Sequence, residues 1–118
     1  DVIIIGGGDT EKYIATYVNQ EFKKYIVHML NKGVKVIGFS AGALLLGEKV
    51  YISPNDHSDH QIKIKNGLGL FSQFLISVHY DSWNEKANKA SAEELVDVPI
   101  IPLNDRSCLV LDKSGKHY

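Results

Sequence analysis

Hydrophobic positions in the first third of the chain fall into two patterns. Residues 2–5 form a wholly apolar run and residues 34–37 a mainly apolar one, each followed closely by glycine. Such short runs are typical of strands buried on both faces of a parallel sheet. Between them, large apolar side chains recur at near-helical spacing and predict one helix from about Glu11 to Leu30, which Gly33 would end. The pattern therefore predicts a strand, a helix and a second strand.

The rest of the chain continues this alternation. A small, aliphatic stretch at 41–47 predicts a helix, the apolar run 74–78 a third strand, and the amphipathic stretch 85–96 another helix. Residues 98–103 read as a strand whose prolines favour a place near a sheet edge. Residues 50–69 are less regular: 53–60 is predicted to be loop, flanked by short strand candidates such as 61–64. Strands that alternate with helices through short connections predict an α/β architecture with a right-handed βαβ unit.

The junction between the second strand and the next helix carries a recognisable motif. Gly38-Phe-Ser-Ala-Gly42 has the G-x-S-x-G pattern of a nucleophile elbow. Its glycines allow a sharp turn and a close packing that a Cβ would obstruct. Ser40 would then stand at the tip of the turn, and the backbone N–H of Ala41, at a helix N-terminus, would face the same space. The motif favours a nucleophilic serine, although a glycine-rich turn with a capping serine has the same spacing.

Polar or glycine residues follow three of the predicted strands, at 6–10, at Ser40 and at His79. In an open parallel sheet, ligands bind beyond the carboxyl ends of the strands, so these residues should face one crevice. A nucleophilic serine needs a base within hydrogen-bond reach. His79 alone among the five histidines follows a buried strand. We therefore expect His79 to be the general base, with a structural histidine as the alternative.

The carboxylate that would orient this base is harder to assign. Asp56 and Asp59 lie in the loop after the elbow helix, and Asp81 follows the histidine by two residues. Any of them could instead be an ordinary solvated loop residue. If the strand continues, Asp81 shares the face of His79 and is poorly aimed, since side chains two apart on a strand point in parallel. Asp56 can approach from the far side and is the preferred candidate.

An oxyanion hole needs two N–H donors near the nucleophile. Ala41 can supply one donor. Gly7 or Gly8 can supply the other, because a neighbouring strand end without side chains can approach closely. The glycine loop matches neither the dinucleotide fingerprint nor the P-loop, which argues against phosphate binding. A glycine turn with no ligand is the alternative interpretation.

Composition narrows the classes of partner. The 118 residues are 44% hydrophobic and 23% charged, with a net charge of -1 and no basic cluster, so neither nucleic acid nor an acidic membrane is expected. The single cysteine, Cys108, excludes an internal disulfide and favours a cytoplasmic location. No stretch approaches the roughly 20 apolar residues of a membrane span, and no signal peptide is expected. Because the chain opens directly on a strand and stops after a turn, both ends look cut.

Several motifs together resemble the peptidase E family of serine peptidases, which are related to cyanophycinases. They are Gly6-Gly-Gly-Asp-Thr10, Gly38-Phe-Ser-Ala-Gly-Ala43, Asn55-Asp56 and Val78-His79, and they occur in the family's order along nearly the whole chain. The resemblance implies the fold of class I glutamine amidotransferases, a three-layer α/β/α arrangement around a mostly parallel sheet. Residues 1–118 would then form a single domain, truncated at both ends relative to the family.

The resemblance also implies roles for individual residues. Ser40 would be the nucleophile, His79 the base and Asp56 the third member of the triad, with Gly7 or Gly8 and Ala41 lining the oxyanion hole. The implied activity is dipeptidase- or aminopeptidase-like cleavage of short peptides through an acyl-enzyme, with aspartyl dipeptides as preferred substrates and no metal or cofactor. The sequence leaves open a homodimer.

Two alternatives belong to other functional classes. The segment Asp56-His-Ser-Asp-His60 offers carboxylate and imidazole ligands, so a metal-binding module with His57 and His60 as ligands is one of them, although the spacing fits no established zinc pattern. The other is a non-catalytic scaffold that keeps the turn without turnover. A generic α/β-hydrolase fits less well, because its acid and histidine lie farther downstream of the serine. An amidotransferase would need a cysteine at the elbow.

Overall fold

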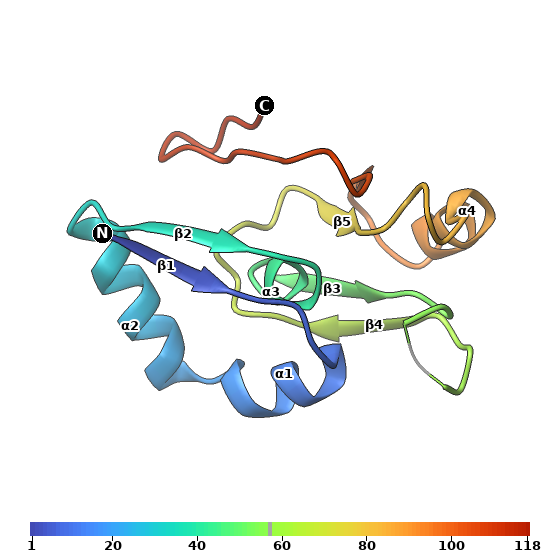
Figure 1. Cartoon of the computed structure of the whole chain (residues 1–118), viewed down its shortest axis with the longest axis horizontal. Helices are drawn as coiled ribbons and strands as arrows, with labels where there is room; N and C mark the ends of the chain where they lie inside the picture. Colours follow the sequence, from blue (N-terminus) through green and yellow to red (C-terminus); the bar gives the residue numbers. More distant parts are fainter. Residues whose placement is uncertain (57) are drawn as a thin grey trace.

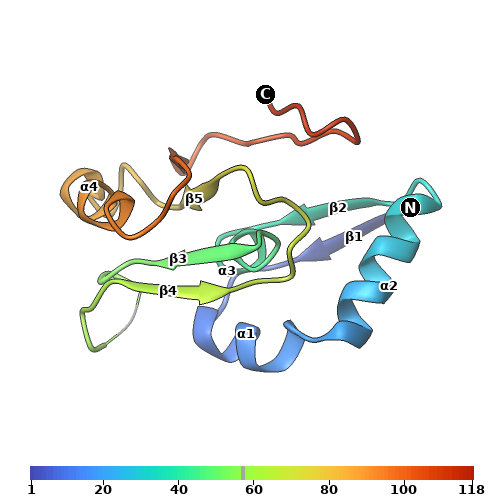
Figure 2. The same cartoon turned by 180° about the vertical axis from the view of Figure 1, so that it is seen from behind.

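A computed structural model describes residues 1–56 and 58–118. The chain contains short strands and helices, and helices α2 and α4 lie at opposite ends of the molecule (Figures 1 and 2). The elements are β1 (Val2–Ile5), α1 (Thr10–Tyr17), α2 (Gln20–Asn31), β2 (Lys35–Gly38), α3 (Ala41–Leu44), β3 (Lys49–Ile52), β4 (Lys63–Asn66), β5 (Leu75–Ser77), α4 (Lys86–Glu93) and β6 (Ile100–Pro102).

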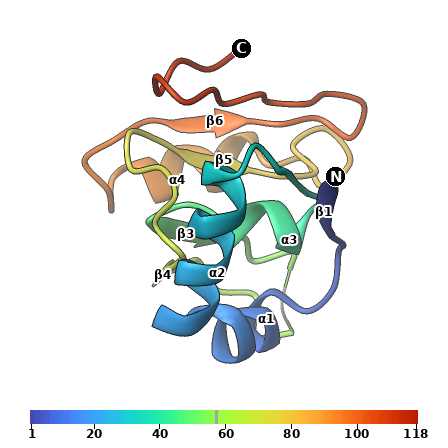
Figure 3. The same cartoon turned by 90° about the vertical axis from the view of Figure 1, so that its left-hand side faces the viewer.

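The strands form three two-stranded pairs. The pair β1–β2 is parallel, with Ile5 opposite Gly38, and the pair β5–β6 is parallel, with Ser77 opposite Pro102. The pair β3–β4 is antiparallel, and its strands flank the predicted loop over residues 53–60. The α/β class is confirmed. In each parallel pair the two strands end on the same side, so the segments that follow them lie close together although they are distant in the sequence. In Figure 3 the C-terminal segment runs over β6, on the side away from α1.

The predicted single helix over residues 11–30 is wrong, because the structure contains two helices with a break at Val18 and Asn19. Asn19 is extended, with φ −149°, and its side chain accepts a hydrogen bond from the N–H of Phe22 at 2.8 Å. Asparagine is a favoured N-cap because its oxygen satisfies one of the first free N–H groups of a helix. Capping at Asn19 therefore starts a new helix within an otherwise continuous apolar period.

The hydrophobic core between β3, β5 and α3 holds β5 in place. It thereby fixes the point at which the chain leaves β5 and continues into His79. Strand β5 is buried throughout, and Val78 is still only 8% exposed. His79 is the first residue beyond this buried run and is only partly buried. The core residues are Leu44, Val50, Ile52, Phe74, Ile76 and Val78. Within the described part of the chain, no helix is long and apolar enough to cross a membrane.

Candidate active site

Ser40 occupies a strained turn between β2 and α3. Its φ of 52° and ψ of −115° lie where a residue other than glycine is rarely found, and such strain costs about 1–3 kcal/mol. The two glycines of the motif make the turn possible. A Cβ at Gly38 would lie 2.6 Å from the carbonyl oxygen of Gly42, and one at Gly42 would collide with the carbonyl of Ile5. The strand–turn–helix context is that of a nucleophile elbow.

The side chain of His79 contacts Ser40 on one side and a carboxylate on the other. Ser40 Oγ lies 3.0 Å from His79 Nε2, and His79 Nδ1 lies 2.6 Å from Asp105 Oδ1. An ionised carboxylate only accepts hydrogen bonds, so Nδ1 carries the proton and Nε2 is left to accept the hydroxyl proton of Ser40. The ring of Trp83 packs on the imidazole, with 4.4 Å between ring centroids.

Asp105 is held in place by the segment that follows His79. Its backbone N–H donates to Asp81 Oδ1 at 3.0 Å. Hydrogen bonds to the carboxylate from the Ser82 side chain and from His79 lower the pKa of Asp105 below its ordinary value. The carboxylate therefore stays ionised at neutral pH, as an acceptor for an imidazole N–H must.

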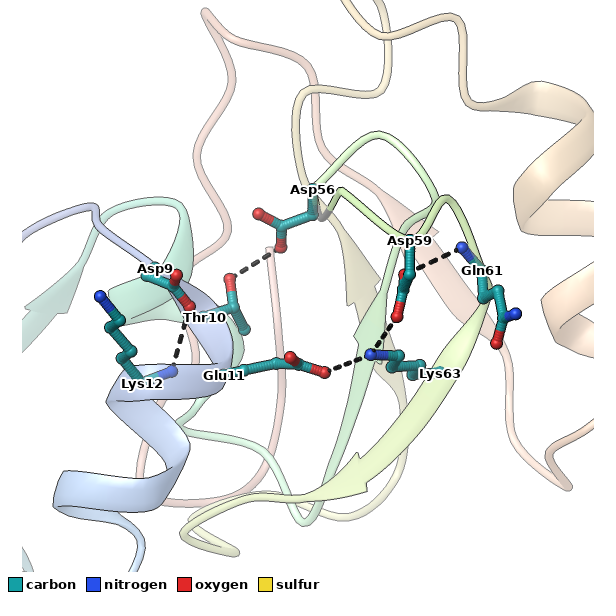
Figure 4. A network of polar contacts seen from close by, with 8 residues as sticks. All are labelled: Asp9, Thr10, Glu11, Lys12, Asp56, Asp59, Gln61 and Lys63. Atoms are coloured by element: carbon teal, nitrogen blue, oxygen red, sulfur yellow. Dashed lines mark hydrogen bonds and ion pairs between the residues drawn. The ribbon is translucent and has the colours of Figure 1, made fainter.

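Asp56, which the sequence interpretation placed against His79, has a different partner. Its Oδ2 accepts a hydrogen bond from the hydroxyl of Thr10 at 2.7 Å, and Thr10 is only 3% exposed (Figure 4). Asp56 follows β3 and faces the first turn of α1, whereas the parallel pairing of β5 with β6 brings Asp105 to the strand end where His79 lies. The structure thus pairs His79 with Asp105 rather than with Asp56.

Sequence reasoning missed Asp105, although one signal pointed to it. The sequence predicts a strand over residues 98–103, and Asn104-Asp-Arg106 follows that strand directly. The rule that placed the other polar strand ends in one crevice applies equally to this end. The other two candidates also have partners: Asp59 forms an ion pair with Lys63 (Figure 4), and Asp81 accepts from the backbone of Asp105.

The glycine loop after β1 lies beside the elbow. A Cβ added at Gly7 would be 3.5 Å from the Cβ of Ser40, and one at Gly8 would be 2.9 Å from the ring of Tyr13. The Tyr13 hydroxyl donates to the carbonyl of Gly7 at 3.0 Å, and Asp9 caps α1 by accepting from the N–H of Lys12 at 3.1 Å (Figure 4). These contacts hold backbone amides of the loop close to the nucleophile candidate.

The metal-binding alternative involves the loop after β3. Among residues 1–56 and 58–118, no group of three or more histidine, cysteine or acidic side chains is arranged to hold a metal ion. His60 Nδ1 lies 3.1 Å from the carbonyl oxygen of Pro54. His57, the other imidazole of that hypothesis, lies outside the described residues.

A buried carboxylate lies behind the site. Glu85, at the start of α4, is fully buried and accepts hydrogen bonds from four uncharged side chains. We call these five residues the Glu85 cluster. The donors are Tyr51 to Oε1 at 2.7 Å, Ser53 to Oε2 at 2.7 Å, Asn55 to Oε2 at 2.7 Å and Asn88 to Oε2 at 3.2 Å.

The Glu85 cluster should limit the stability of the folded protein at high pH, and this limit can be measured. Burial, followed by the hydrogen bond to Glu85 and its negative charge, raises the pKa of Tyr51 well above its ordinary value. The neutral phenol therefore favours the folded state fully below about pH 10, and this contribution is lost as the pH rises towards the folded-state pKa. We expect Tyr51 to ionise together with alkaline unfolding, as a step in phenolate absorbance that coincides with the loss of circular dichroism.

The matched control for this titration is Tyr25→Phe, which removes a half-exposed tyrosine and should keep the unfolding-linked step. Tyr51→Phe should remove it. Complete ionisation of Tyr51 before any loss of secondary structure would contradict the expectation.

An elbow serine in contact with a histidine that is paired with a carboxylate defines the arrangement of the serine hydrolases. The sequence model of peptidase family S51 matches residues 1–118, and the chain belongs to this family. The resemblance to the peptidase E family is thereby confirmed.

The fold is also similar to a solved structure, a peptidase from an acI-B1 Actinobacterium. The TM-score is 0.64 at 22% sequence identity, over 92% of this chain and 44% of that one. This chain therefore spans less than half the length of that peptidase. A comparison with curated protein sequences finds no match.

Proposed function

We propose that this protein is a serine peptidase that hydrolyses short peptides, with Ser40 as nucleophile, His79 as general base and Asp105 as the orienting carboxylate. One observation carries the proposal: the Ser40 hydroxyl lies 3.0 Å from one imidazole nitrogen of His79, and Asp105 lies 2.6 Å from the other. Membership of a peptidase family supports the same class of reaction.

In the proposed reaction, Ser40 Oγ attacks the carbonyl carbon of the scissile peptide bond while His79 Nε2 takes its proton. The negative oxygen that forms is stabilised by the N–H of Ala41 and by an N–H of Gly7 or Gly8. Collapse of this intermediate breaks the C–N bond. His79 gives its proton to the departing amine, and the acyl group stays on Ser40 as an ester. A water molecule deprotonated by His79 then hydrolyses the ester.

Asp105 acts through His79. Its carboxylate accepts the Nδ1 proton, which keeps Nε2 available to Ser40, and it stabilises the imidazolium that forms during the attack. Asp56 has a separate task in this proposal. By accepting from Thr10, it holds the first turn of α1 and the adjacent glycine loop, which carries part of the oxyanion hole.

We further propose dipeptidase- or aminopeptidase-like cleavage, with aspartyl dipeptides among the substrates, and a cytoplasmic location. The reaction requires no metal ion or cofactor. Support for the substrate class comes from the motifs shared with the peptidase E family. The location is supported by the low cysteine content, since the single cysteine, Cys108, is exposed and free.

Inhibition of the intact protein by two kinds of reagent tests this proposal against the metal-binding alternative. Hydrolysis of a panel of dipeptides should be abolished by a fluorophosphonate, which reacts with an activated serine, and should be unchanged by EDTA. Each reagent should be compared with a mock-treated sample of the same preparation. Loss of hydrolysis with EDTA, restored by zinc, would instead favour a metal-dependent site at His57 and His60.

A further inference from the structure

The turn that carries His79 is anchored at its far end on the Glu85 cluster. The N–H of Trp83 donates to the carbonyl of His79 at 2.9 Å, and the N–H of Glu85 donates to the carbonyl of Tyr80 at 3.1 Å. His79 itself has a φ of 52°, a conformation that the chain holds only when neighbouring contacts impose it. The position of the imidazole therefore depends on where residues 83–85 are fixed.

Three donors of the cluster come from strand β3 and the turn that follows it. Tyr51 on β3, Ser53 just after it and Asn55 in the following turn all donate to the carboxylate of Glu85. The amide of Asn55 also donates to the carbonyl oxygen of Trp83 at 3.1 Å. Asn55 thus joins the loop after β3 to two points of the segment that follows His79.

We infer that Glu85 is a positioning residue for the proposed peptidase reaction. Its buried carboxylate holds the side chains of β3 and of the turn after it, and fixes residues 79–85, which places the His79 imidazole between Ser40 and Asp105. The inference rests on the proposed function for its catalytic consequence. Its structural consequence, the placement of the His79 ring, can be measured separately.

Charge on Glu85 is central to this role. Hydrogen bonds to an ionised acceptor are about twice as strong as those between neutral groups, and Oε2 accepts three of them. Glutamine at this position has the same shape but only one accepting oxygen, so it cannot satisfy all four donors in the same way. A small displacement of His79 follows, and a displacement of about 1 Å can lower the rate about 100-fold.

The test uses three variants of the intact protein. Glu85→Gln removes the charge, and Asn55→Ala removes the hydrogen bond to the Trp83 carbonyl together with one of the four hydrogen bonds to Glu85, while leaving the carboxylate in place. Glu94→Gln makes the same chemical change as the first variant at an exposed position at the end of α4, and it serves as the matched control. Near-ultraviolet circular dichroism and the melting temperature establish which variants are folded at the assay temperature.

Two readouts separate positioning from a merely structural role. The first is the split between kcat and KM on one dipeptide: Glu85→Gln should lower kcat about 10-fold or more while KM changes less than about 2-fold, since the imidazole is misplaced and the peptide-binding surface is not. Asn55→Ala should lower kcat in the same direction by a smaller factor, and Glu94→Gln should not change it.

The second readout needs no activity. Trp83 is the chain's single tryptophan, and its ring packs on His79. We therefore expect the imidazole to quench its fluorescence, and a protonated imidazole to quench it more strongly. We expect the pH-dependent quenching of Trp83 to weaken in Glu85→Gln and in Asn55→Ala and to persist in Glu94→Gln. If Glu85→Gln does not fold, Asn55→Ala carries the test alone.

The outcomes test the positioning role of Glu85 separately from the proposed peptidase function. Unchanged kcat and unchanged Trp83 quenching in the folded variants would overturn the positioning role and leave the proposed function intact. A wild-type protein without hydrolytic activity would refute the proposed function. In that case weakened quenching in the variants still supports the placement of His79 by Glu85, and unchanged quenching overturns it.

Discussion

Ser40→Ala should abolish peptide hydrolysis, with kcat falling by at least about 10,000-fold, because removing the nucleophile leaves only the binding and oxyanion contributions. The change deletes one partly buried oxygen and opens no cavity in the hydrophobic core. Alanine has the same difficulty as serine with a φ of 52°, so the strain of the turn is retained. Turnover of a dipeptide by the purified variant is the measurement.

Ser91→Ala provides the control for this experiment. Ser91 is exposed on α4, and losing its hydroxyl should leave both hydrolysis and melting temperature near the wild-type values. If the folded Ser40→Ala protein kept wild-type turnover, the elbow would have only a structural role. The peptidase mechanism would then have to use another nucleophile.

Asp105→Asn should lower kcat by about 100- to 10,000-fold, because an amide does not hold the His79 tautomer that accepts the proton of Ser40. The loss should appear in kcat with little change in KM, since Asp105 contacts the base and acts before and during proton transfer. Melting temperature should change little, because Asp105 is an exposed residue.

Asp56→Asn is the matched comparison, because it makes the same substitution at the carboxylate that sequence reasoning preferred. It weakens the contact with Thr10 and should lower kcat about 10-fold or less, through the glycine loop rather than through the base. A large loss in Asp56→Asn together with near wild-type kcat in Asp105→Asn would reverse the assignment of the carboxylate while leaving Ser40 and His79 in place.

The elbow could be predicted from the sequence because it is a local feature. Two glycines flank Ser40 between an apolar run and a small aliphatic stretch. A Cβ at Gly38 would meet the backbone of the same turn, and one at Gly42 would meet the carbonyl of Ile5 on the neighbouring strand β1. His79 was predictable for a related reason, since it is the first polar residue after a buried strand. Both positions follow from the order of elements along the chain.

The carboxylate that pairs with His79 could not be predicted in this way, because its identity depends on how distant segments of the chain pair. Asp105 lies 26 residues from His79 and reaches it only because β6 runs parallel to β5. Asp56 lies nearer in sequence, but the first turn of α1 offers it the Thr10 hydroxyl. Glu85 gave no signal at all in the sequence, because an acidic residue at a helix start is ordinarily exposed.

The measurement that tests the central claim most directly is the site and rate of modification by a fluorophosphonate. Peptide mapping by mass spectrometry identifies the modified residue in wild-type protein, and the same reaction is timed in Asp105→Asn. We predict an adduct on Ser40 that forms about 100-fold or more slowly in Asp105→Asn, because the hydroxyl is activated only through an oriented imidazole. An adduct on another residue, no adduct, or equal rates in the two proteins would contradict the assignment of Ser40, His79 and Asp105 as one catalytic unit.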